Sequence, residues 1–521
     1  MTTSILTCIF GWPLLAALAL IFVPGNYRVI IRAMAIVATF ISMVLAIKMF
    51  VQYGCAPAGP TGFRFEQQIP WVESLGISYH VGVDGLNVGL ILMGAIVAFA
   101  AACCSFEIES REKEFYILLL VMSGGILGAF ASLDLFFFYF LHELALVPTF
   151  IMIGVWGRGE RKNYATFQIT LYLSLGALIA LIGLIALYLQ SGANTFDIPT
   201  LIEHAKTNPM ALNAQKFIFP LLLFGFGILV SLWPFHTWAP LGYGSAPSPT
   251  AMLHAGVLKK FGLYGLIRIA LPLLPQAAQS WMQILAWLCL GNILFVGWVA
   301  MRQKNLNLLI GNSSVAHMGF VFLGIASLNL IGITGAVVIM VAHGFLAALT
   351  FALSGYIYRQ TGTLEMSQLG GLCRQLPFIG TALLMAALAG CGLPGFVNFV
   401  GEVTVFFGAW KVFPAVTVCA VWGALLIGAL YMLRAMRNVL HGPLPQQWTA
   451  LPDANLWRKV PYALLLASLL VLGCFPRLLT DKITPDAARI VSCFASDKAP
   501  DKLVVQADFS AVRNPKSEIR N

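Results

Sequence analysis

Five ionisable side chains lie within long apolar stretches of this sequence, namely Glu143, Lys260, His317, His343 and Glu402. A charged group near the middle of a membrane helix costs roughly 2.5–3.5 kcal/mol on insertion scales, so such residues face the interior of a helix bundle and mark ion paths. Burial disfavours the charged form of all five groups, which lets them take up and release protons through water. The pattern therefore predicts a row of proton-exchanging groups inside a membrane protein.

Each of these residues also has a purely structural interpretation. His317 and His343 could each be a core histidine that bonds a neighbouring carbonyl oxygen. Glu143 and Glu402 are harder to explain as packing residues, because a carboxylate is costly at this depth. We therefore expect both glutamates to belong to the path, whereas both interpretations stay open for the two histidines.

Weaker candidates accompany these five residues. Lys259 is adjacent to Lys260, so the two side chains point about 100° apart on a helix and only one is expected to face the path. His142, His236 and His254 could also carry a proton. His236 lies inside a proline-interrupted segment, where it could instead satisfy freed backbone groups.

Other kinds of site are not supported by the sequence. Asp84 and Asp134 lie at segment ends, where helix capping is the expected role, and Arg268 could pair or reach the membrane surface. The ten cysteines show no Cys-x-x-Cys spacing and most lie in apolar segments, so packing is expected rather than a metal or iron–sulfur site. Neither a phosphate loop nor a dinucleotide fingerprint occurs, so no cofactor is expected in this chain.

The composition indicates the fold class. Of the 521 residues, 59% are hydrophobic and only 10% are charged, whereas an average soluble domain carries about 25% charged residues. We count about 14 apolar segments of the length that spans a bilayer as a helix. The runs are too continuous for the alternating pattern of a membrane β-barrel. The predicted fold is an all-α polytopic membrane protein.

Lysine and arginine residues predict the orientation in the membrane. They gather in every second connection, at residues 28–32, 111–113, 158–162, 302–304, 359–374 and 434–459. The other connections hold fewer, namely Arg64, Lys206, Lys216 and Lys411. Because cytoplasmic loops carry the excess of these residues, both termini are expected outside. The formal net charge of +10 is then a topology signal, and nucleic-acid binding is not expected.

Two of the apolar segments are interrupted by proline. The seventh contains "WPFHTWAP", with Pro234 and Pro240, and the twelfth contains "GCGLPGF", with Pro394. Backbone groups freed inside a bilayer must be satisfied by protein or water, so both breaks are expected to point inward. The breaks lie five segments apart, which predicts two inverted five-helix repeats, helices 4–8 and 9–13. Two unrelated proline kinks are the alternative interpretation.

The predicted division of the chain follows these segments. Helices 1–3 occupy residues 1–110, the first repeat 111–273, the second repeat 274–440 and helix 14 residues 441–476. Residues 477–521 mix charges and show little periodicity. We expect them to form a solvated extramembrane tail.

Six longer motifs occur in the order "SYHVGVDGLNV", "HELALVP", "WPFHTWAPLGYGSAPSPTAMLHAGVLKKFGLYGLIR", "NSSVAHMGFV", "MVAHGF" and "GLPGFVNFVGE". Together they resemble the antiporter-like membrane subunits of complex I, the NADH-quinone oxidoreductase, and within that family the subunit M (chain 4) group. The resemblance covers almost the entire chain up to the last apolar segment. The C-terminal tail falls outside it.

The resemblance implies a fold with discontinuous helices 7 and 12 in two inverted repeats, and proton pumping driven by quinone reduction elsewhere in the assembly. The family's helix 5 glutamate corresponds to Glu143, its helix 8 lysine to Lys260, its helix 10 and 11 histidines to His317 and His343, and its helix 12 glutamate to Glu402. Glu143 would receive the coupling signal from a neighbouring subunit. Lys260 would be the central proton carrier, and Glu402 would exchange protons with the far half or the outside.

The resemblance also implies partners. NADH, FMN, iron–sulfur clusters and quinone would be bound by other subunits, antiporter-like neighbours would flank this chain on both sides, and the assembly would lie in a bacterial inner membrane. A subunit of a multi-subunit cation/proton antiporter, or of a membrane-bound hydrogenase-type complex, would share the fold and motifs. A structural spacer that has lost pumping is a third alternative.

One residue of the family pattern is missing. The family has a helix 7 lysine that pairs with the helix 5 glutamate, but the aligned position in "PLLLFGFGILVSLWPFH" is Leu229. Glu143 therefore lacks a stabilising partner charge. Either His142, His236 or His254 substitutes for the lysine, or the N-terminal half is defective as a pump, and the sequence does not decide between the two.

Overall fold

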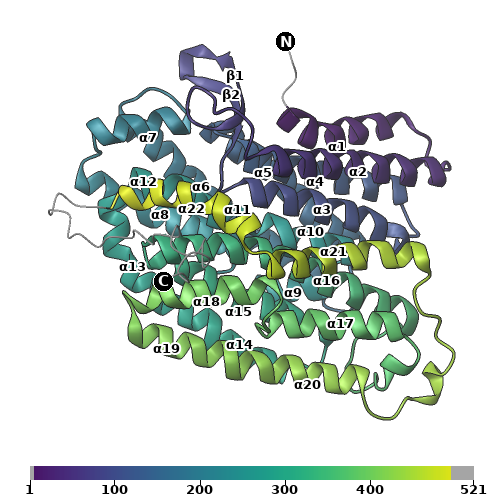
Figure 1. Ribbon diagram of the computed structural model, residues 1–521. Coiled ribbons are helices and arrows are strands. Elements are labelled where there is room, and N and C mark those ends of the chain that lie inside the picture. Colours follow the sequence, from purple (N-terminus) through teal and green to yellow (C-terminus); the bar gives the residue numbers. More distant parts are fainter. Residues whose placement is uncertain (1–4, 495–521) are drawn as a thin grey trace, which may run out of the picture.

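The computed structural model describes residues 5–494, and the chain in this range is almost entirely helical (Figure 1). Twelve helices of the described range are long and apolar enough to cross a membrane. They are α1 (Ile5–Phe22), α2 (Arg28–Gln52), α3 with η2 (Val88–Glu107), α4 (Glu112–Ala131), α5 (Leu135–Trp156), α6 (Lys162–Ser191), α8 (Leu212–Val230), α13 to α14 (Pro275–Arg302), α15 (Leu306–Ala326), α16 (Leu330–Thr361), α19 to α20 (Pro414–Leu440) and α21 (Leu456–Cys474). A helical polytopic membrane protein is therefore confirmed.

Other apolar helices are shorter. Residues 248–273 form one rod of short pieces with two π-helical turns, in the order α10 (Ser248–Leu253), η3 (His254–Leu258), α11 (Lys260–Gly265), η4 (Leu266–Ala270) and α12 (Leu271–Leu273). Helix is interrupted at 231–237, between α8 and α9 (Trp238–Ser245), and at 391–396, between α17 (Pro377–Gly390) and α18 (Val397–Trp410). Pro234 and Pro394 lie in these interruptions, whereas Pro240 lies inside α9.

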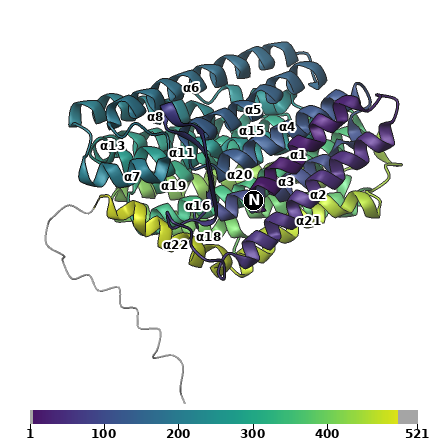
Figure 2. The ribbon, with the colours of Figure 1, turned by 90° about the horizontal axis from the view of Figure 1, so that it is seen from above.

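The centre of the bundle is surrounded by protein. α16 is buried along its spanning length, α15 and α3 are almost entirely buried, and so is the 248–273 rod. α16 packs against α3, α15 and α18, and α10 packs against both α3 and α16. α1, α2, α6 and α21 lie at the edges of the bundle (Figures 1 and 2) and expose apolar side chains. A polar group on a central helix therefore has protein on every side.

A β-hairpin that the sequence pattern does not predict caps one end of the bundle. Its strands β1 (Arg64–Val72) and β2 (Ile77–Val83) pair antiparallel and are joined by the short helix η1 (Glu73–Leu75). β1 mixes polar and apolar residues and is partly exposed, and β2 is mostly buried. The buried strand places one histidine, His80, in a cluster of carboxylates.

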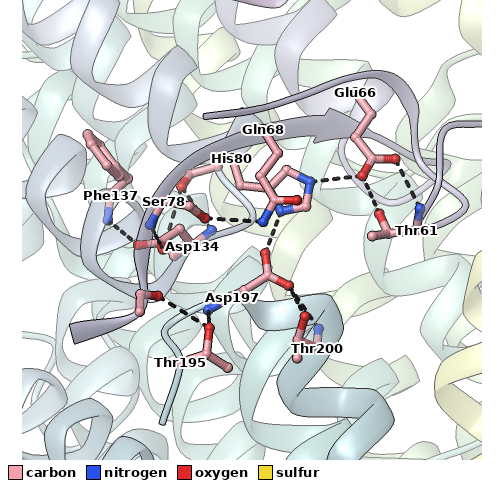
Figure 3. Close-up of polar contacts among 12 residues, drawn as sticks. Thr61, Glu66, Gln68, Ser78, His80, Asp134, Phe137, Thr195, Asp197 and Thr200 are labelled. Carbon is pink, nitrogen blue, oxygen red and sulfur yellow. Dashed lines mark hydrogen bonds and ion pairs between the residues drawn. The ribbon is translucent and has the colours of Figure 1, made fainter. Parts of the chain in front are cut away.

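His80 links the hairpin to the helix that follows α6 (Figure 3). Its Nε2 lies 3.0 Å from Glu66 Oε1, and its Nδ1 contacts Oδ1 of Asp197. Asp197 is the N-cap residue of α7 (Ile198–Thr207) and accepts a hydrogen bond from the Thr200 N–H at 3.0 Å. One fully buried imidazole therefore bridges two carboxylates from different parts of the chain.

The carboxylates control the charge of this cluster. Burial alone would lower the pKa of His80, but the hydrogen bonds and charges of Asp197 and Glu66 outweigh burial and raise that pKa above its usual value. Burial would raise the pKa of Asp197, but hydrogen bonds from His80 and Thr200 hold it below its usual value. The geometry therefore favours a protonated His80 beside an ionised Asp197.

The two aspartates at segment ends have different roles. Asp134 is the N-cap of α5 and accepts from the N–H groups of Phe136 and Phe137 at 2.9 and 3.2 Å, and burial raises its pKa to about 6. Asp84 accepts from the Leu86 N–H at 2.9 Å just before α3. It also forms an ion pair of 2.6 Å with Arg268. Capping is confirmed for Asp134, whereas the N-cap of α3 is Asn87, so Asp84 holds the turn before that helix and pairs with Arg268.

Part of the predicted tail is structured. Residues 477–492 form α22 (Arg477–Ser492), which packs against α16 and buries Leu479, Ile483 and Ile490. Asp486 on α22 accepts a hydrogen bond of 2.6 Å from the Gly85 N–H. This packed helix, whose buried apolar residues share one face, was not expected from the sequence. The predicted tail beyond residue 494 lies outside the described residues.

We expect His80→Gln to lower the melting temperature of the purified protein more at about pH 5.5 than at about pH 9. A raised histidine pKa contributes stability that is present below its unfolded value of about 6.5 and is lost as the pH rises through the folded pKa. Asp197 sets the lower pH limit of this comparison. Its folded pKa is depressed, so its contribution to the stability of the fold is lost as the pH falls through that pKa. His204→Gln, at an exposed histidine of α7, is the matched control. An equal loss at both pH values would contradict a charged His80.

Candidate functional site

Lys260 and His343 are in direct contact at the centre of the bundle. Both side chains are buried, and Lys260 Nζ lies 2.8 Å from Nδ1 of His343. Lys260 also donates to the carbonyl oxygen of Ala255, which the π-helical turn η3 leaves close to the ammonium group. The lysine of one central helix and the histidine of another can therefore exchange a proton without a large movement.

His317 lies next along the row, on α15. Its ring centroid is 5.6 Å from that of His343. Its Nδ1 lies 2.7 Å from the Ser313 carbonyl oxygen and its Nε2 lies 3.1 Å from that of Gly390. Since both ring nitrogens face acceptors, the ring can donate from both of them whenever it carries a second proton.

Glu402 ends the row on α18, one turn after the break at 391–396. The side chain is buried, and its Oε1 lies 3.9 Å from Nε2 of His317. A cavity of about 10 Å³, lined by His317, Glu402, Gly390 and Tyr431, adjoins both groups. This is about the space that one water molecule needs. Lys260, His343, His317 and Glu402 therefore form one contiguous polar row.

Both adjacent lysines are buried, but only Lys260 contacts a member of the row. Lys259 Nζ lies 3.5 Å from the hydroxyl of Ser314 and 5.7 Å from the ring centroid of Tyr243. The reason is that the 248–273 rod lies at the centre of the bundle, so every face of it meets protein. Within residues 5–494, neither lysine forms an ion pair with a carboxylate.

His254 belongs to a second polar connection beside the row. Its Nδ1 lies 3.1 Å from the hydroxyl of Tyr243, whose ring the Lys259 ammonium approaches. The order His254, Tyr243, Lys259, Ser314 leads from the rod to α15. Of the three weaker candidates, His254 is thus the histidine whose hydrogen-bond partner, Tyr243, also contacts a lysine.

Glu143 lies apart from the row. Its side chain is 32% exposed on α5, and its Oε1 lies 3.4 Å from Nδ1 of the buried His142. The ring of His142 stacks on Phe261 with 3.8 Å between ring centroids. His142 therefore contacts the 248–273 rod through the apolar ring of Phe261. Leu229 is buried on α8, which packs against α11.

An asparagine that sequence reasoning missed satisfies the break between α8 and α9. Asn292 lies in the π-helical turn η5 (Gly291–Val296), accepts from the Trp233 N–H at 2.7 Å and donates to the Ser231 carbonyl oxygen at 2.9 Å. His236, the residue expected to do this, also hydrogen-bonds the Pro234 backbone carbonyl within the break and packs edge-on against Phe295. The only sequence signal for this role is that an asparagine, which can bond freed backbone groups, occurs within an apolar segment.

Hydroxyl groups beside the row were missed as well. Ser313 lies one turn before His317, with its Oγ 3.1 Å from the hydroxyl of Tyr431. Ser314 contacts Lys259, and Tyr243 contacts His254. The spacing of four residues in "NSSVAH" could have indicated Ser313, because residues i and i+4 share a helix face. The two tyrosines carry no such local signal.

Comparison with known proteins places this chain among respiratory membrane subunits. The family described as "NADH:quinone oxidoreductase/Mrp antiporter, TM" matches residues 132–428. The chain is 34% identical over 484 residues to NAD(P)H-quinone oxidoreductase chain 4 1 of Picosynechococcus sp., covering 91% of this chain and 89% of the relative. It is 33% identical over 473 residues to NADH-quinone oxidoreductase subunit M of Rhodobacter capsulatus, covering 89% and 91%.

Solved structures agree with these relatives. A chain of respiratory complex I from Thermus thermophilus matches with a TM-score of 0.86 and 27% identity, covering 94% of this chain and all of that one. A chain of the Mrp complex from Dietzia sp. matches with a TM-score of 0.82 and 19% identity, covering 95% of this chain and all of that one. The likeness to the Mrp chain extends to the fold alone.

We expect Gly392→Ala to destabilise the protein more than Gly395→Ala. Both glycines lie in the break with positive φ, +69° and +102°, so each alanine adds strain of about 1–2 kcal/mol. Only at Gly392 would the added Cβ meet the Glu402 carboxylate, whereas at Gly395 the space is open. The melting temperatures of both variants, and the Glu402 position by cryo-electron microscopy, check this. Equal losses with an unmoved Glu402 would contradict the described fit.

Proposed function

Because the chain belongs to the NADH:quinone oxidoreductase/Mrp antiporter family of transmembrane proteins, we propose that it is the proton-translocating membrane subunit of an NADH-quinone oxidoreductase. The observation that carries this proposal is the contiguous row of Lys260, His343, His317 and Glu402 inside the bundle. The relatives named as chain 4 and subunit M support the choice of complex. Proton movement along the row would be coupled to quinone reduction elsewhere in the complex.

The contacts suggest an order of proton transfer. The Lys260 ammonium donates a proton to His343 Nδ1 across 2.8 Å and becomes a neutral amine. His343 passes a proton to His317, whose ring centroid lies 5.6 Å away, through a small rotation or a water molecule. His317 then protonates the Glu402 carboxylate across 3.9 Å. Glu402, beside the break in the helix, releases the proton toward the far half or the outside.

The finer architecture follows from the same proposal. The 248–273 rod and the α17 to α18 pair each serve as a membrane span, and they add to the twelve long helices. The chain then has about 14 spans, with inverted repeats over residues 111–273 and 274–440. The breaks at 231–237 and 391–396 occupy equivalent places in the two repeats. Both termini lie outside a bacterial inner membrane by the distribution of lysine and arginine.

Glu143 is the proposed input from a neighbouring subunit. Its carboxylate reaches the surface of α5, where the apolar side chains of Phe140, Val147 and Ile151 are also exposed. A partly exposed carboxylate on such a face suits a contact with another membrane subunit better than one with lipid. His254 takes over the role of the helix 7 lysine missing at Leu229, through Tyr243 and Lys259.

The redox chemistry is assigned to partner subunits. NADH, FMN, iron–sulfur clusters and quinone would bind there, and this chain would contribute proton transfer alone. The names of the relatives, which call them chains or subunits of quinone oxidoreductases, support this division. A subunit of a cation/proton antiporter is the second candidate, because the Mrp chain shares the fold. A membrane-bound hydrogenase-type complex is a further alternative.

We expect Lys260→Ala and Glu402→Ala each to reduce proton translocation by at least about tenfold, because each removes a group that carries the proton. Quinone-linked pumping by the intact complex in proteoliposomes is the measurement. Lys216→Ala, at an exposed lysine of α8, and Glu203→Ala, at an exposed glutamate of α7, are matched controls. Unchanged pumping in both row variants would refute the assigned roles.

We expect Leu229→Lys to leave pumping unchanged or to lower it, because His254 already supplies the basic group and a further buried cation adds cost. Leu229→Met, which adds a long uncharged side chain at the same place, controls for altered packing. Pumping that increases with lysine but not with methionine would show instead that the N-terminal half of the native chain is defective.

A further inference from the structure

A groove on the outer surface of the bundle has a lining that proton transfer does not explain. It encloses a cavity of about 520 Å³ between α2, η2 (Ser105–Glu107) and the start of α21. Its apolar walls include Ile36, Phe99, Phe106 and Trp457. α3 packs against both α2 and α21 and forms the floor.

One end of the groove is lined by arginine. Arg359, near the end of α16, and Arg458, near the start of α21, form no ion pair with a carboxylate anywhere in residues 5–494. The nearby Glu107 is already held by Arg158 at 3.0 Å and by the Ser248 N–H at 3.1 Å. Two guanidinium groups without a carboxylate partner among residues 5–494 therefore line the groove, and that of Arg458 also contacts the Tyr356 hydroxyl.

The third arginine is held in place rather than free. Arg32 donates two hydrogen bonds to Glu112, at 2.9 and 2.8 Å, which fixes its guanidinium at the rim of the groove. The arginine end thus has two guanidinium groups without a carboxylate partner, those of Arg359 and Arg458. The charge of the third, Arg32, is largely neutralised by Glu112. The net charge of this end remains positive.

The groove opens on a face of the bundle whose exposed side chains are apolar, as expected of a surface in contact with lipid. α2 exposes Val37, Phe40 and Val44, and α21 exposes Leu456 and Trp457 at its start. Tryptophan is enriched at the membrane–water interface, which places the arginine end at the level of the lipid headgroups. Arg32, Arg359 and Arg458 belong to the connections expected on the cytoplasmic side.

We propose that this groove binds one anionic glycerophospholipid of the surrounding bilayer. The phosphodiester would accept hydrogen bonds from Arg359 and Arg458, a pairing that suits the planar guanidinium group. The acyl chains would lie over Ile36 and Phe99 along α2 and α3. The apolar walls favour a lipid over a free phosphate ion, because a free ion would leave them uncovered.

Native mass spectrometry of the purified full-length chain tests this site. The protein is incubated with phosphatidylglycerol or with phosphatidylcholine, and the lipids retained per chain are counted. We expect Arg359→Gln/Arg458→Gln to retain one phosphatidylglycerol fewer than the native protein, with no change in phosphatidylcholine. Arg437→Gln, at an exposed arginine of α20 (Ala429–Leu440) away from the groove, is the matched control and should behave like the native protein.

Three results would overturn the proposal. One is an unchanged phosphatidylglycerol count in the double variant, and another is an equal loss of both lipids, which would indicate apolar contact alone. The third is displacement of phosphatidylglycerol by inorganic phosphate, which would identify a free anion as the ligand. If the double variant does not fold, a photoactivatable phosphatidylglycerol is crosslinked to the native chain instead. Adducts on α2, α3 or α21 support the site, and adducts confined to other helices exclude it.

Discussion

The structure depends on one constraint, which is that a polar group inside an apolar bundle must find its partner within the protein. The two interruptions of helix and the row of ionisable groups are linked by this constraint. At the break after α17, the freed Gly390 carbonyl oxygen faces Nε2 of His317. At the break after α8, the side chain of Asn292 bonds both Trp233 and Ser231. Unwound backbone and titratable side chains therefore meet at the centre.

The sequence predicts the parts of this arrangement that are costly in a membrane. Glu402, Lys260 and the prolines are conspicuous because an apolar helix has no structural use for them. The partners of these groups are not conspicuous, and so Asn292 and Tyr431 went unpredicted. Which residues share the interior depends on which helices are central, and hydropathy alone does not give that order. For this reason the burial of Lys259 beside Lys260 could not be read from the sequence.

The two ends of the chain show what local patterns omit. The β-hairpin was missed because β1 mixes polar and apolar residues without a regular alternation, and the ionic bridge through His80 that ties it to α7 has no local sequence signal. α22 was missed because its apolar residues are few, yet it is held by Asp486 against the loop before α3. The row joins the two halves of the bundle. His317, His343 and Glu402 come from the C-terminal half and Lys260 from the N-terminal half, where the ring of Phe261 stacks on His142.

The central claim is that protons pass from Lys260 to Glu402 through the two histidines. A cryo-electron microscopy map of the intact complex that resolves ordered water is its most direct test, because the rings of His343 and His317 lie 5.6 Å apart between centroids and no direct hydrogen bond joins them in the described residues. The account predicts water density, or an alternative histidine rotamer, joining His343 to His317 and His317 to Glu402. Dry, close packing across either gap, with single well-defined rotamers, would contradict it.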